Sequence, residues 1–163
     1  MYQIRRATID DLQEISRIEM DNFGEGVATS QDVFSQKLIQ QKGHIFVADK
    51  EGKVIGFIEG LSSYEAHLKD EMFLGTNLHK EGGPWEILLS LVVDQNYQSQ
   101  GIGRGLLNYQ LAICKERGQE GVLLTCRDYL IDYYEHFGFE NQGLSDSRLG
   151  GLDWYKMLLK LSQ

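Results

Sequence analysis

The sequence predicts an α/β (α+β) fold in which a mixed sheet lies between layers of helices. Short apolar runs, typical of strands, alternate along the chain with segments whose apolar residues recur every three or four positions, as on one face of a helix. The run Glu86–Val93 is nearly continuous in apolar residues, which is typical of a central strand covered on both faces. Helices between buried strands favour three layers with the sheet in the middle.

The N-terminal part of the chain is predicted to form a strand over residues 2–7 and two helices. Asp10 and Asp11 offer an N-cap to the first helix and Ser30 offers one to the second, because short polar side chains accept hydrogen bonds from the free amides of a first turn. Apolar residues then recur at helical spacing, namely Leu12, Ile15, Ile18, Val33, Phe34, Leu38 and Ile39.

A β-hairpin and a long polar loop are predicted next. Strands over residues 44–48 and 53–58 flank a tight turn in which Gly52 supplies a positive φ. Residues 62–83 are polar and show little periodicity. Loops of this length inside a compact domain tend to be functional or mobile, so this segment is a candidate lid.

Helices and strands continue to alternate after the central strand. The predicted elements are a helix over residues 105–117, a buried strand over 122–126, a short helix over 130–137 and a last strand over 154–161. Gly118 and Gly121 are expected to close the first of these helices, and Gly138 the second.

The composition indicates one globular domain over residues 1–163 and excludes several classes of protein. Of the 163 residues, 42% are hydrophobic and 25% are charged, which is an ordinary globular mixture. The formal net charge of -8 argues against a nucleic-acid partner, because such binders cluster lysine and arginine. The charge suits a cationic partner such as an amine, although a solvated acidic surface is the commoner reason for it.

No membrane segment or signal peptide is predicted. No apolar run approaches the length that spans a bilayer, and the N-terminus has no apolar core of the kind that signal peptides carry. The only cysteines, Cys114 and Cys126, lack metal-ligand spacing. We therefore expect a reduced, cytoplasmic protein without a bound metal.

The most specific pattern in the sequence is a glycine-rich turn between the central strand and the next helix. Gly101, Gly103 and Gly105 lie where a buried strand runs into an amphipathic helix. Glycines let the backbone approach a bulky anion, and the amides at a helix start lack intrahelical partners, so together they form a diphosphate site. Arg104 can add a charge-assisted contact. The alternative is a turn that is merely tight, but three glycines at one helix start favour the ligand site.

Two familiar diphosphate motifs do not fit this turn. A nicotinamide site places G-x-G-x-x-G after the first strand of the fold, and a P-loop requires G-x-x-x-x-G-K-[ST]. Here the glycines alternate with other residues and the turn follows the fourth predicted strand. Both alternatives are therefore poor explanations of the pattern.

The pattern Gln98-x-x-Gly101-x-Gly103 resembles the acetyl-CoA signature of the GCN5-related N-acetyltransferases, the GNAT superfamily. The order of the predicted elements resembles that superfamily over most of the chain. The resemblance implies a GNAT-like, mostly antiparallel sheet of six to seven strands flanked by about four helices. Residues 78–83 and 133–139 resemble the arylalkylamine N-acetyltransferase branch in particular.

The resemblance also implies where acetyl-CoA binds. In the superfamily the pantetheine arm pairs like an extra strand with the end of the central strand, where the sheet splays, and this corresponds to Leu91, Val92 and Val93. The pyrophosphate is implied to bind amides of the turn. The implied turn residues are Gln98, Ser99, Gln100, Gly101, Ile102, Gly103 and Arg104.

Tyr134 is the implied catalytic residue. In related enzymes a tyrosine in a Y-x-x-F-G-F segment stands near the CoA sulfur and protonates the departing thiolate. A phenol with a pKa of about 10 stays protonated at neutral pH, so it can serve as this donor. Two alternatives stay open: Tyr134 only packs the short helix, or Tyr133 takes the role if the register differs by one.

The acceptor amine must lose a proton, since an alkylamine with a pKa of about 10.4 is almost fully protonated at pH 7. A general base or a water chain would raise the reactive fraction. Ile87 and Leu89 stand where an enzyme of the arylalkylamine branch carries two histidines, which argues against arylalkylamine substrates. Glu86 is a candidate substrate-site residue acting through water, and the alternative is an exposed glutamate at the end of a strand.

We therefore expect an N-acetyltransferase that moves an acetyl group from acetyl-CoA directly to a primary amine of a small molecule. Neither cysteine has a placed partner, which favours direct transfer over an acyl-enzyme. Two other functions stay open: an acyl-CoA-binding sensor without efficient catalysis, and an acetyltransferase of protein N-termini or lysines. A homodimer formed by strand pairing also stays open.

Overall fold

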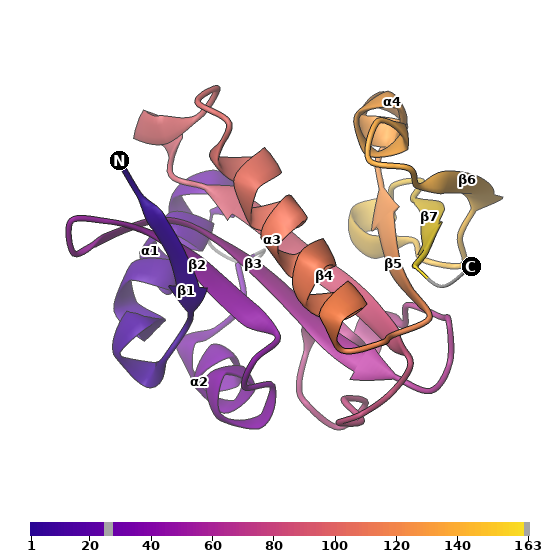
Figure 1. Cartoon of the computed structure of the whole chain (residues 1–163), viewed down its shortest axis with the longest axis horizontal. Helices are drawn as coiled ribbons and strands as arrows, with labels where there is room; N and C mark the ends of the chain where they lie inside the picture. The colour runs from indigo at the N-terminus through magenta and orange to yellow at the C-terminus, as the bar shows by residue number, and fades with distance from the viewer. Residues whose placement is uncertain (25–27, 162–163) are drawn as a thin grey trace.

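A seven-stranded sheet forms the centre of the molecule, with its strands in the order β1-β2-β3-β4-β5-β7-β6 (Figure 1). The computed structural model describes residues 1–24 and 28–161. The strands are β1 (Gln3–Arg6), β2 (Ile45–Lys50), β3 (Lys53–Ser63), β4 (Trp85–Val93), β5 (Gly121–Cys126), β6 (Glu140–Leu144) and β7 (Tyr155–Lys160). Neighbouring strands are antiparallel except for β4 and β5, which are parallel. The predicted mixed, mostly antiparallel sheet is confirmed.

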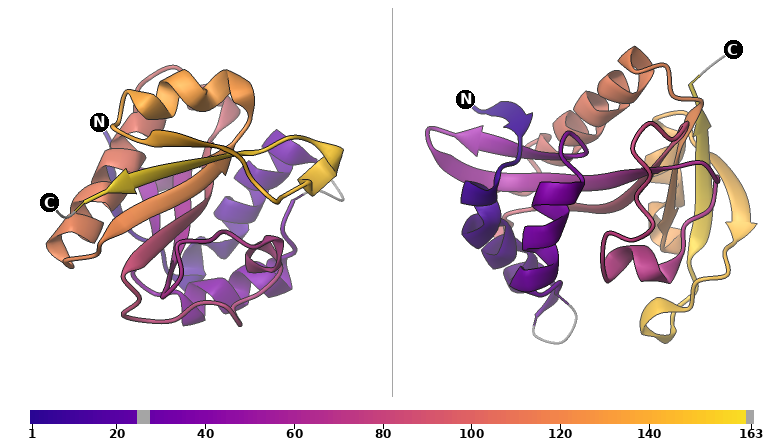
Figure 2. Two further views of the ribbon diagram at one scale, coloured as in Figure 1. Left: turned by 90° about the vertical axis from the view of Figure 1, so that its right-hand side faces the viewer. Right: turned by 90° about the horizontal axis from the view of Figure 1, so that it is seen from below.

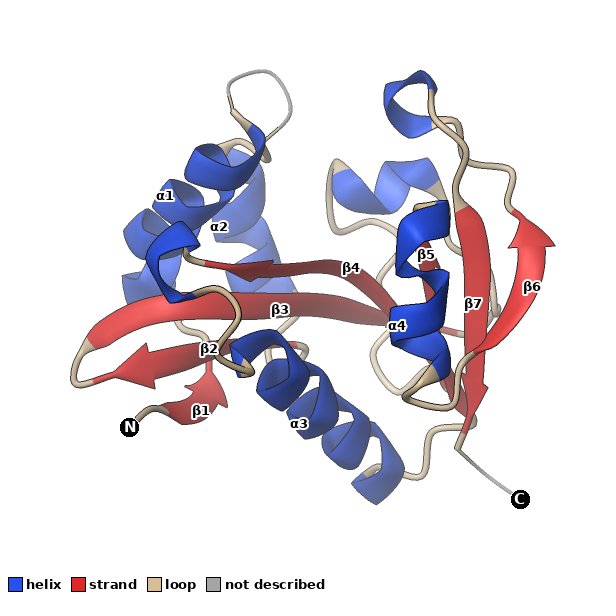
Figure 3. Cartoon of the chain, turned by 90° about the horizontal axis from the view of Figure 1, so that it is seen from above, coloured by secondary structure: helices blue, strands red, loops and turns tan. Residues whose placement is uncertain are grey.

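Helices cover both faces of the sheet (Figure 3). They are α1 (Leu12–Phe23), α2 (Gln31–Gln40), α3 (Ile102–Glu116) and α4 (Ile131–Glu135). Short 3-10 helices span Ile9–Asp11, Asp70–Phe73, Gln95–Tyr97, Asp128–Leu130 and Leu149–Gly151. One apolar cluster joins α1 and α2 to β2, β3 and β4, and a larger cluster joins α3 and α4 to the other face. The three predicted layers are confirmed.

Of the predicted side-chain caps, that of Ser30 is confirmed, whereas neither Asp10 nor Asp11 caps α1 through its side chain. Ser30 caps α2, and its side chain accepts a hydrogen bond from the Val33 amide at 3.2 Å. Asp11 is the N-cap of α1, but its carboxylate accepts the Thr8 amide at 2.8 Å and pairs with Arg5 at 2.9 Å. A 3-10 turn therefore precedes α1, and Asp11 ties this turn to β1. Across residues 1–24 and 28–161, every helix falls short of the length and apolar character that crossing a bilayer requires.

The strand β6 was not predicted from the sequence. Its residues are mostly exposed, because β6 is an edge strand, and they lack the alternation of apolar and polar residues that marks a half-buried strand. The hairpin is confirmed, although β2 and β3 are longer than predicted and join through a two-residue turn, Glu51 and Gly52, with both φ values positive.

The helix α3 begins three residues earlier than predicted, at Ile102, so Gly103 and Gly105 lie in its first turn. Gly118, with a φ of 74°, ends this helix as predicted. Gly121 does not close it but begins β5, where a Cβ atom would lie 2.5 Å from both the Leu159 carbonyl oxygen and the Trp85 ring. The close approach of three strands, rather than a helix end, requires this glycine.

The loop between β3 and β4, residues 64–84, packs on the same face of the sheet as α1 and α2 (Figure 2). It belongs to a third apolar cluster, made of Leu61, Leu68, Met72, Ile87 and Leu123. The Ala66 carbonyl accepts a hydrogen bond from Lys156 Nζ at 2.9 Å, and Asp70 accepts one from the Ser147 hydroxyl at 2.7 Å. The candidate lid is thus docked against β7 and the segment before it, and its opening stays a prediction.

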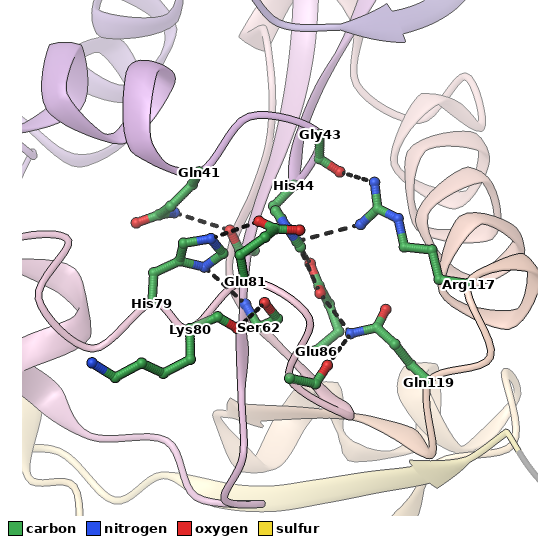
Figure 4. A network of polar contacts seen from close by, with 12 residues as sticks. Gln41, Gly43, His44, Ser62, His79, Lys80, Glu81, Glu86, Arg117 and Gln119 are labelled. Atoms are coloured by element: carbon green, nitrogen blue, oxygen red, sulfur yellow. Dashed lines mark hydrogen bonds and ion pairs between the residues drawn. The ribbon is translucent and has the colours of Figure 1, made fainter.

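A buried hydrogen-bond network holds the start of β4 in place (Figure 4). The Glu86 side chain is 0% exposed. Its carboxylate accepts hydrogen bonds from Gln110 Nε2 at 2.8 Å and Gln119 Nε2 at 3.1 Å, and from His44 Nδ1 at 2.9 Å. A carboxylate only accepts, so His44 carries a proton on Nδ1. The network joins β4 to the start of β2, to α3 and to the turn before β5.

Glu81 extends this network to the surface. His44 Nε2 lies 3.1 Å from Glu81 Oε1, and the Glu81 side chain is 71% exposed. Burial alone would lower the pKa of His44, but the hydrogen bond and charge of Glu86, together with the charge of Glu81, outweigh burial and raise this pKa above its ordinary value. A protonated His44 between two carboxylates therefore fastens the β3–β4 loop to the core.

We expect Glu86→Gln to lower the free energy of unfolding by about 3 kcal/mol at pH 6, because it leaves a buried imidazolium without its partner. The raised pKa of His44 makes this contribution complete below the ordinary histidine pKa of about 6.5, and it is lost as the pH rises through the folded-state pKa. The difference between the variant and the unmodified protein should therefore shrink toward alkaline pH. Urea unfolding in a pH series measures it.

Glu116→Gln is the matched control, since Glu116 is exposed on α3 and makes the same change of charge. It should leave the free energy of unfolding within about 0.5 kcal/mol at every pH. A loss for Glu86→Gln that stays constant from acid to alkaline pH would show that the charge of His44 plays no part.

Candidate functional site

The sheet divides where β4 and β5 separate. The two strands pair only through Trp85 with Gly121, Glu86 with Val122 and Ile87 with Leu123. Beyond these pairs β4 remains paired with β3 as far as Val93, whereas β5 remains paired with β7 (Figure 3). The edge of β4 that faces β5 therefore carries backbone groups outside the sheet ladder from residue 88 onward.

A β-bulge lies at the point of divergence. Glu59 pairs with Ser90 and Gly60 pairs with Leu88, so β4 has one extra residue, Leu89, opposite β3. The extra residue of a bulge is left out of the ladder and bends its strand. The bend turns β4 away from β5 and leaves the Leu89 backbone facing the opening.

A narrow cavity fills the start of the opening. Its walls are formed by Ile58, Leu88, Leu89, Ser90, Leu91, Leu107, Leu124, Thr125 and Tyr134. Six of these nine residues are aliphatic, and the other three, Ser90, Thr125 and Tyr134, carry hydroxyl groups. Of the predicted strand residues, Leu91 lines this cavity, while Val92 is buried against α1 and α2. The carbonyl oxygen of Val93 already accepts a hydrogen bond from Gln98 Nε2 at 3.1 Å.

The three glycines of the turn serve three different purposes. Gly101 has a φ of 81° and is the N-cap of α3, a conformation that favours glycine. At Gly105 a Cβ atom would lie 2.6 Å from the Tyr2 hydroxyl, so this glycine admits the N-terminal strand. At Gly103 the nearest atoms to a Cβ would be Val93 Cγ2 at 3.8 Å and the Tyr133 hydroxyl at 3.9 Å. Neither backbone nor packing requires Gly103, which leaves a surface suited to close approach by a ligand.

Free amides surround that surface. The first hydrogen bond within α3 runs from the Gly105 amide to the Gly101 carbonyl at 3.0 Å. The amides of Ile102, Gly103 and Arg104 therefore precede the first donor of the helix and have no acceptor inside it. Together with the helix dipole they suit an anion, and Arg104 is exposed beside them.

The side chain of Gln98 takes a structural position. Its Nε2 donates to the Val93 carbonyl at 3.1 Å and to Asn22 Oδ1 at 3.2 Å, which fastens the turn to the end of β4 and to α1. Ser99 has a φ of 64°, and Ser99 and Gln100 are both exposed. The sequence therefore located the turn correctly, while Gln98 supports its shape through the side chain.

The adjacent tyrosines on α4 face different parts of the site. Tyr134 lines the narrow cavity, and its ring packs edge-on against Phe139 with centroids 5.9 Å apart. Burial, and to a smaller degree Cys126 and Tyr133, raises the pKa of Tyr134, so its phenol keeps its proton. The hydroxyl of Tyr133 instead lies near Gly103. Of the two alternatives, the structure brings Tyr134 to the opening of the sheet.

Glu86 lies elsewhere than expected. The prediction of an exposed glutamate at the end of a strand is wrong, because α3 and the β3–β4 loop cover it. Its carboxylate is engaged by His44, Gln110 and Gln119, and Glu86 does not line the narrow cavity. Glu86 thus stabilises the end at which β4 and β5 are paired.

His44, His79 and Glu81 form a group whose side-chain donor atoms all lie within 4.8 Å of one another, as a metal site would require. However, His79 Nδ1 accepts a hydrogen bond from the Ser62 amide at 3.2 Å, so the proton of the neutral ring lies on Nε2, which donates to Glu81 at 3.0 Å. A metal on Nε2 would move that proton to Nδ1, toward the Ser62 amide. The hydrogen bonds of this group therefore favour a proton-holding cluster.

A second cavity, of about 130 Å³, lies on the other side of Thr125. Its lining residues are His67, Leu68, Thr125, Leu144, Ser145, Asp146 and Lys156. Thr125 borders both cavities, so they approach each other across β5. Sequence reasoning missed this cavity, because its residues come from the loop, three strands and a turn that only the sheet register brings together.

The sequence of this chain is similar to those of known acetyltransferases. The family model described as "Acetyltransferase (GNAT) family" matches residues 10–139. A curated relative, serotonin N-acetyltransferase of Mesocricetus auratus, is 29% identical over 113 residues, which cover 69% of this chain and 53% of the relative. The chain therefore spans about half the length of that relative.

Solved structures share the fold. The loading GNATL domain of CurA from Lyngbya majuscula has a TM-score of 0.85 at 18% identity, covering 99% of this chain and 98% of that one. PaiA N-acetyltransferase from Thermoplasma acidophilum, solved in complex with coenzyme A, has a TM-score of 0.69 at 20% identity, covering 98% and 99% of the two chains. With a family model matching most of its length, the chain belongs to the acetyltransferase (GNAT) family.

Proposed function

We propose that this chain is an N-acetyltransferase that moves an acetyl group from acetyl-CoA directly to a primary amine of a small molecule. The observation that carries the proposal is the meeting of three features at one opening of the sheet. These are the free amides at the start of α3, the divergence of β4 from β5, and the Tyr134 phenol on the cavity wall.

The residues present fit coenzyme A. The amides of Ile102, Gly103 and Arg104 would hold its diphosphate, since the absence of a Cβ atom at Gly103 leaves room for a ligand to approach them. The free edge of β4 around Leu91 would pair with the amide groups of its pantetheine arm, as a further strand would. This edge is apolar on both sides, so the pairing would be shielded from water.

When bound, acetyl-CoA supplies a thioester: the amine nitrogen bonds to its carbonyl carbon, the carbon–sulfur bond breaks, and the sulfur gains a proton while the amine loses one. Tyr134 would provide the proton to the sulfur, because its raised pKa keeps the phenol protonated up to alkaline pH. The Leu89 backbone, left out of the ladder by the bulge, would donate its amide to the thioester carbonyl.

Direct transfer agrees with the state of the two cysteines. Cys114 and Cys126 are both buried and free. Burial raises the pKa of Cys126 to about 11 and raises that of Cys114 further, so neither forms a thiolate at neutral pH. An acyl-enzyme intermediate on either thiol is therefore disfavoured.

The cavity of about 130 Å³ beside Thr125 is our candidate for the acceptor site. Its volume is close to that of a protein cavity that holds one benzene ring, roughly 150 Å³, which suits part of a small molecule better than a folded protein surface. Its position across β5 from the Tyr134 cavity would bring an amine toward the thioester.

Three further expectations remain proposals of the same kind. We infer a single domain over residues 1–163 and a cytoplasmic location, the latter supported by the two unpaired cysteines. The exposed edges of β1 and β6 are where strand pairing would build a homodimer.

Gly103→Leu should fold normally and weaken binding of coenzyme A by at least about tenfold, because its side chain would fill the space over the free amides. Isothermal titration calorimetry with coenzyme A measures the affinity. Ala112→Leu, on an exposed position of the same helix, is the matched control and should bind normally. Undiminished affinity in Gly103→Leu would place the diphosphate elsewhere.

Tyr134→Phe should lower turnover about 100-fold while leaving the affinity for acetyl-CoA nearly unchanged, because only the proton donor is lost. Thiol release measured with a panel of primary amines gives the turnover. Tyr133→Phe is the control and should lose much less. A larger loss in Tyr133→Phe would transfer the role to that residue, and full activity in both would leave the thiolate without a tyrosine donor.

A further inference from the structure

One basic side chain lies on the wall of the second cavity, and a second follows on the same face of the sheet. In the β5–β7 ladder Thr125 pairs with Lys156 and Cys126 pairs with Tyr155. Side chains alternate between the faces of a sheet, so Arg127 continues the face of Thr125, while Trp154 continues the face of Lys156. Lys156 lines the cavity itself, and Arg127 follows one step further along the same face.

Two aromatic rings lie near the guanidinium of Arg127. Its guanidinium carbon lies 6.0 Å from the centroid of the Tyr129 ring and 5.9 Å from that of Trp154. Trp154 is itself fixed by a hydrogen bond from Nε1 to the Leu149 carbonyl at 2.8 Å. A guanidinium is planar and weakly hydrated and is attracted to aromatic rings, so Arg127 is suited to bind a planar anion.

Neither base has an acidic partner in the part of the chain that the structure describes. Lys156 Nζ donates only to the Ala66 carbonyl, and Arg127 Nε is buried without any hydrogen-bond acceptor there. By contrast, Arg5 contacts two carboxylates and Lys37 contacts Glu59 at 2.7 Å.

From this arrangement we infer that the amine acceptor also carries a carboxylate, which Lys156 and Arg127 bind. The inference rests on the proposed acetyl transfer and names its substrate class. A carboxylate would supply the counter-charge that the described residues lack, and the planar fork of Arg127 matches its two oxygens. Asp146, on the same cavity, is the one acidic lining residue and would attract the ammonium group of an amino acid.

The shared wall makes the two ends of such a molecule compatible with the reaction. Thr125 borders both cavities, and Lys156 is its direct partner in the ladder. A carboxylate held by Lys156 would therefore leave the amine of a short amino acid free to approach the Tyr134 cavity. Fixing one end of a flexible acceptor in this way raises the fraction of encounters with productive geometry.

The test compares amino acids with their amides, so that each pair shares an amine and differs in the carboxylate. Thiol release from acetyl-CoA is measured with a panel of amino acids of increasing chain length and with the matching amides. After correction for the neutral fraction of each amine, we expect kcat/KM to be larger for the acid than for its amide, so that the ratio of the two exceeds one. Arg127→Met and Lys156→Met should each lower this ratio about tenfold.

Lys160→Met is the matched control, since Lys160 lies on the same strand and is exposed away from the cavity. It removes the same charge and should leave the ratio unchanged. Lys156→Met removes the hydrogen bond to the Ala66 carbonyl as well as the charge, so it can also alter the β3–β4 loop. Arg127→Met leaves that hydrogen bond in place and therefore tests the loss of charge alone. Thermal unfolding of each variant confirms that it is folded.

Calorimetric titration of the same acids into the protein saturated with coenzyme A separates the two proposals. Thiol release with equal or greater preference for the amides would overturn the carboxylate inference and leave acetyl transfer intact. Binding of the acids that is lost in Arg127→Met, without thiol release from any amine, would support the anion site and overturn the transferase. Neither binding nor thiol release would overturn both.

Discussion

The separation of β4 from β5 is the constraint on which the rest of the structure depends. Pairing ends after Ile87 because the bulge at Leu89 bends β4, while β7 continues to pair with β5. Backbone amides and carbonyls exposed along the free edge in an apolar setting are costly unless something pairs with them. A ligand that carries its own amide groups along a narrow chain would offset this cost, which supports the proposal that coenzyme A binds along β4.

Hydrogen bonds at the paired end of β4 and β5 limit how far the two strands separate. Gln119, just before β5, donates both to Glu86 and to the Gly83 carbonyl, which binds the two strand starts together. The ion pair of Glu86 with His44 then anchors β4 to β2. A buried ion pair of this kind adds little net stability, since desolvation offsets most of the attraction. Its value here is positional, because it prevents the separation from spreading along β4.

Features that depend on consecutive residues could be predicted from the sequence, whereas features that depend on how the strands pair could not. The glycine turn could be located because its chemistry depends on consecutive residues, and Tyr134 because it lies in a short motif. The burial of Glu86 was missed, since its partners come from three distant segments. Arg127 was missed for the same reason, because its significance depends on which residue of β7 lies beside it. The exposed edge strand β6 lacked any hydrophobic pattern to predict it.

Both the net charge of the whole chain and the charges beside the cavity affect which acceptor the protein would select. The net charge of -8 draws cations toward the whole surface, but this attraction weakens beyond a Debye length of about 8 Å at physiological salt and does not distinguish one amine from another. Close to the cavity, Lys156 and Arg127 repel a second ammonium group while they attract a carboxylate. A diamine would gain from the overall field and lose at the site, whereas an amino acid loses nothing at either. The repulsive element therefore provides the discrimination that the attractive field cannot.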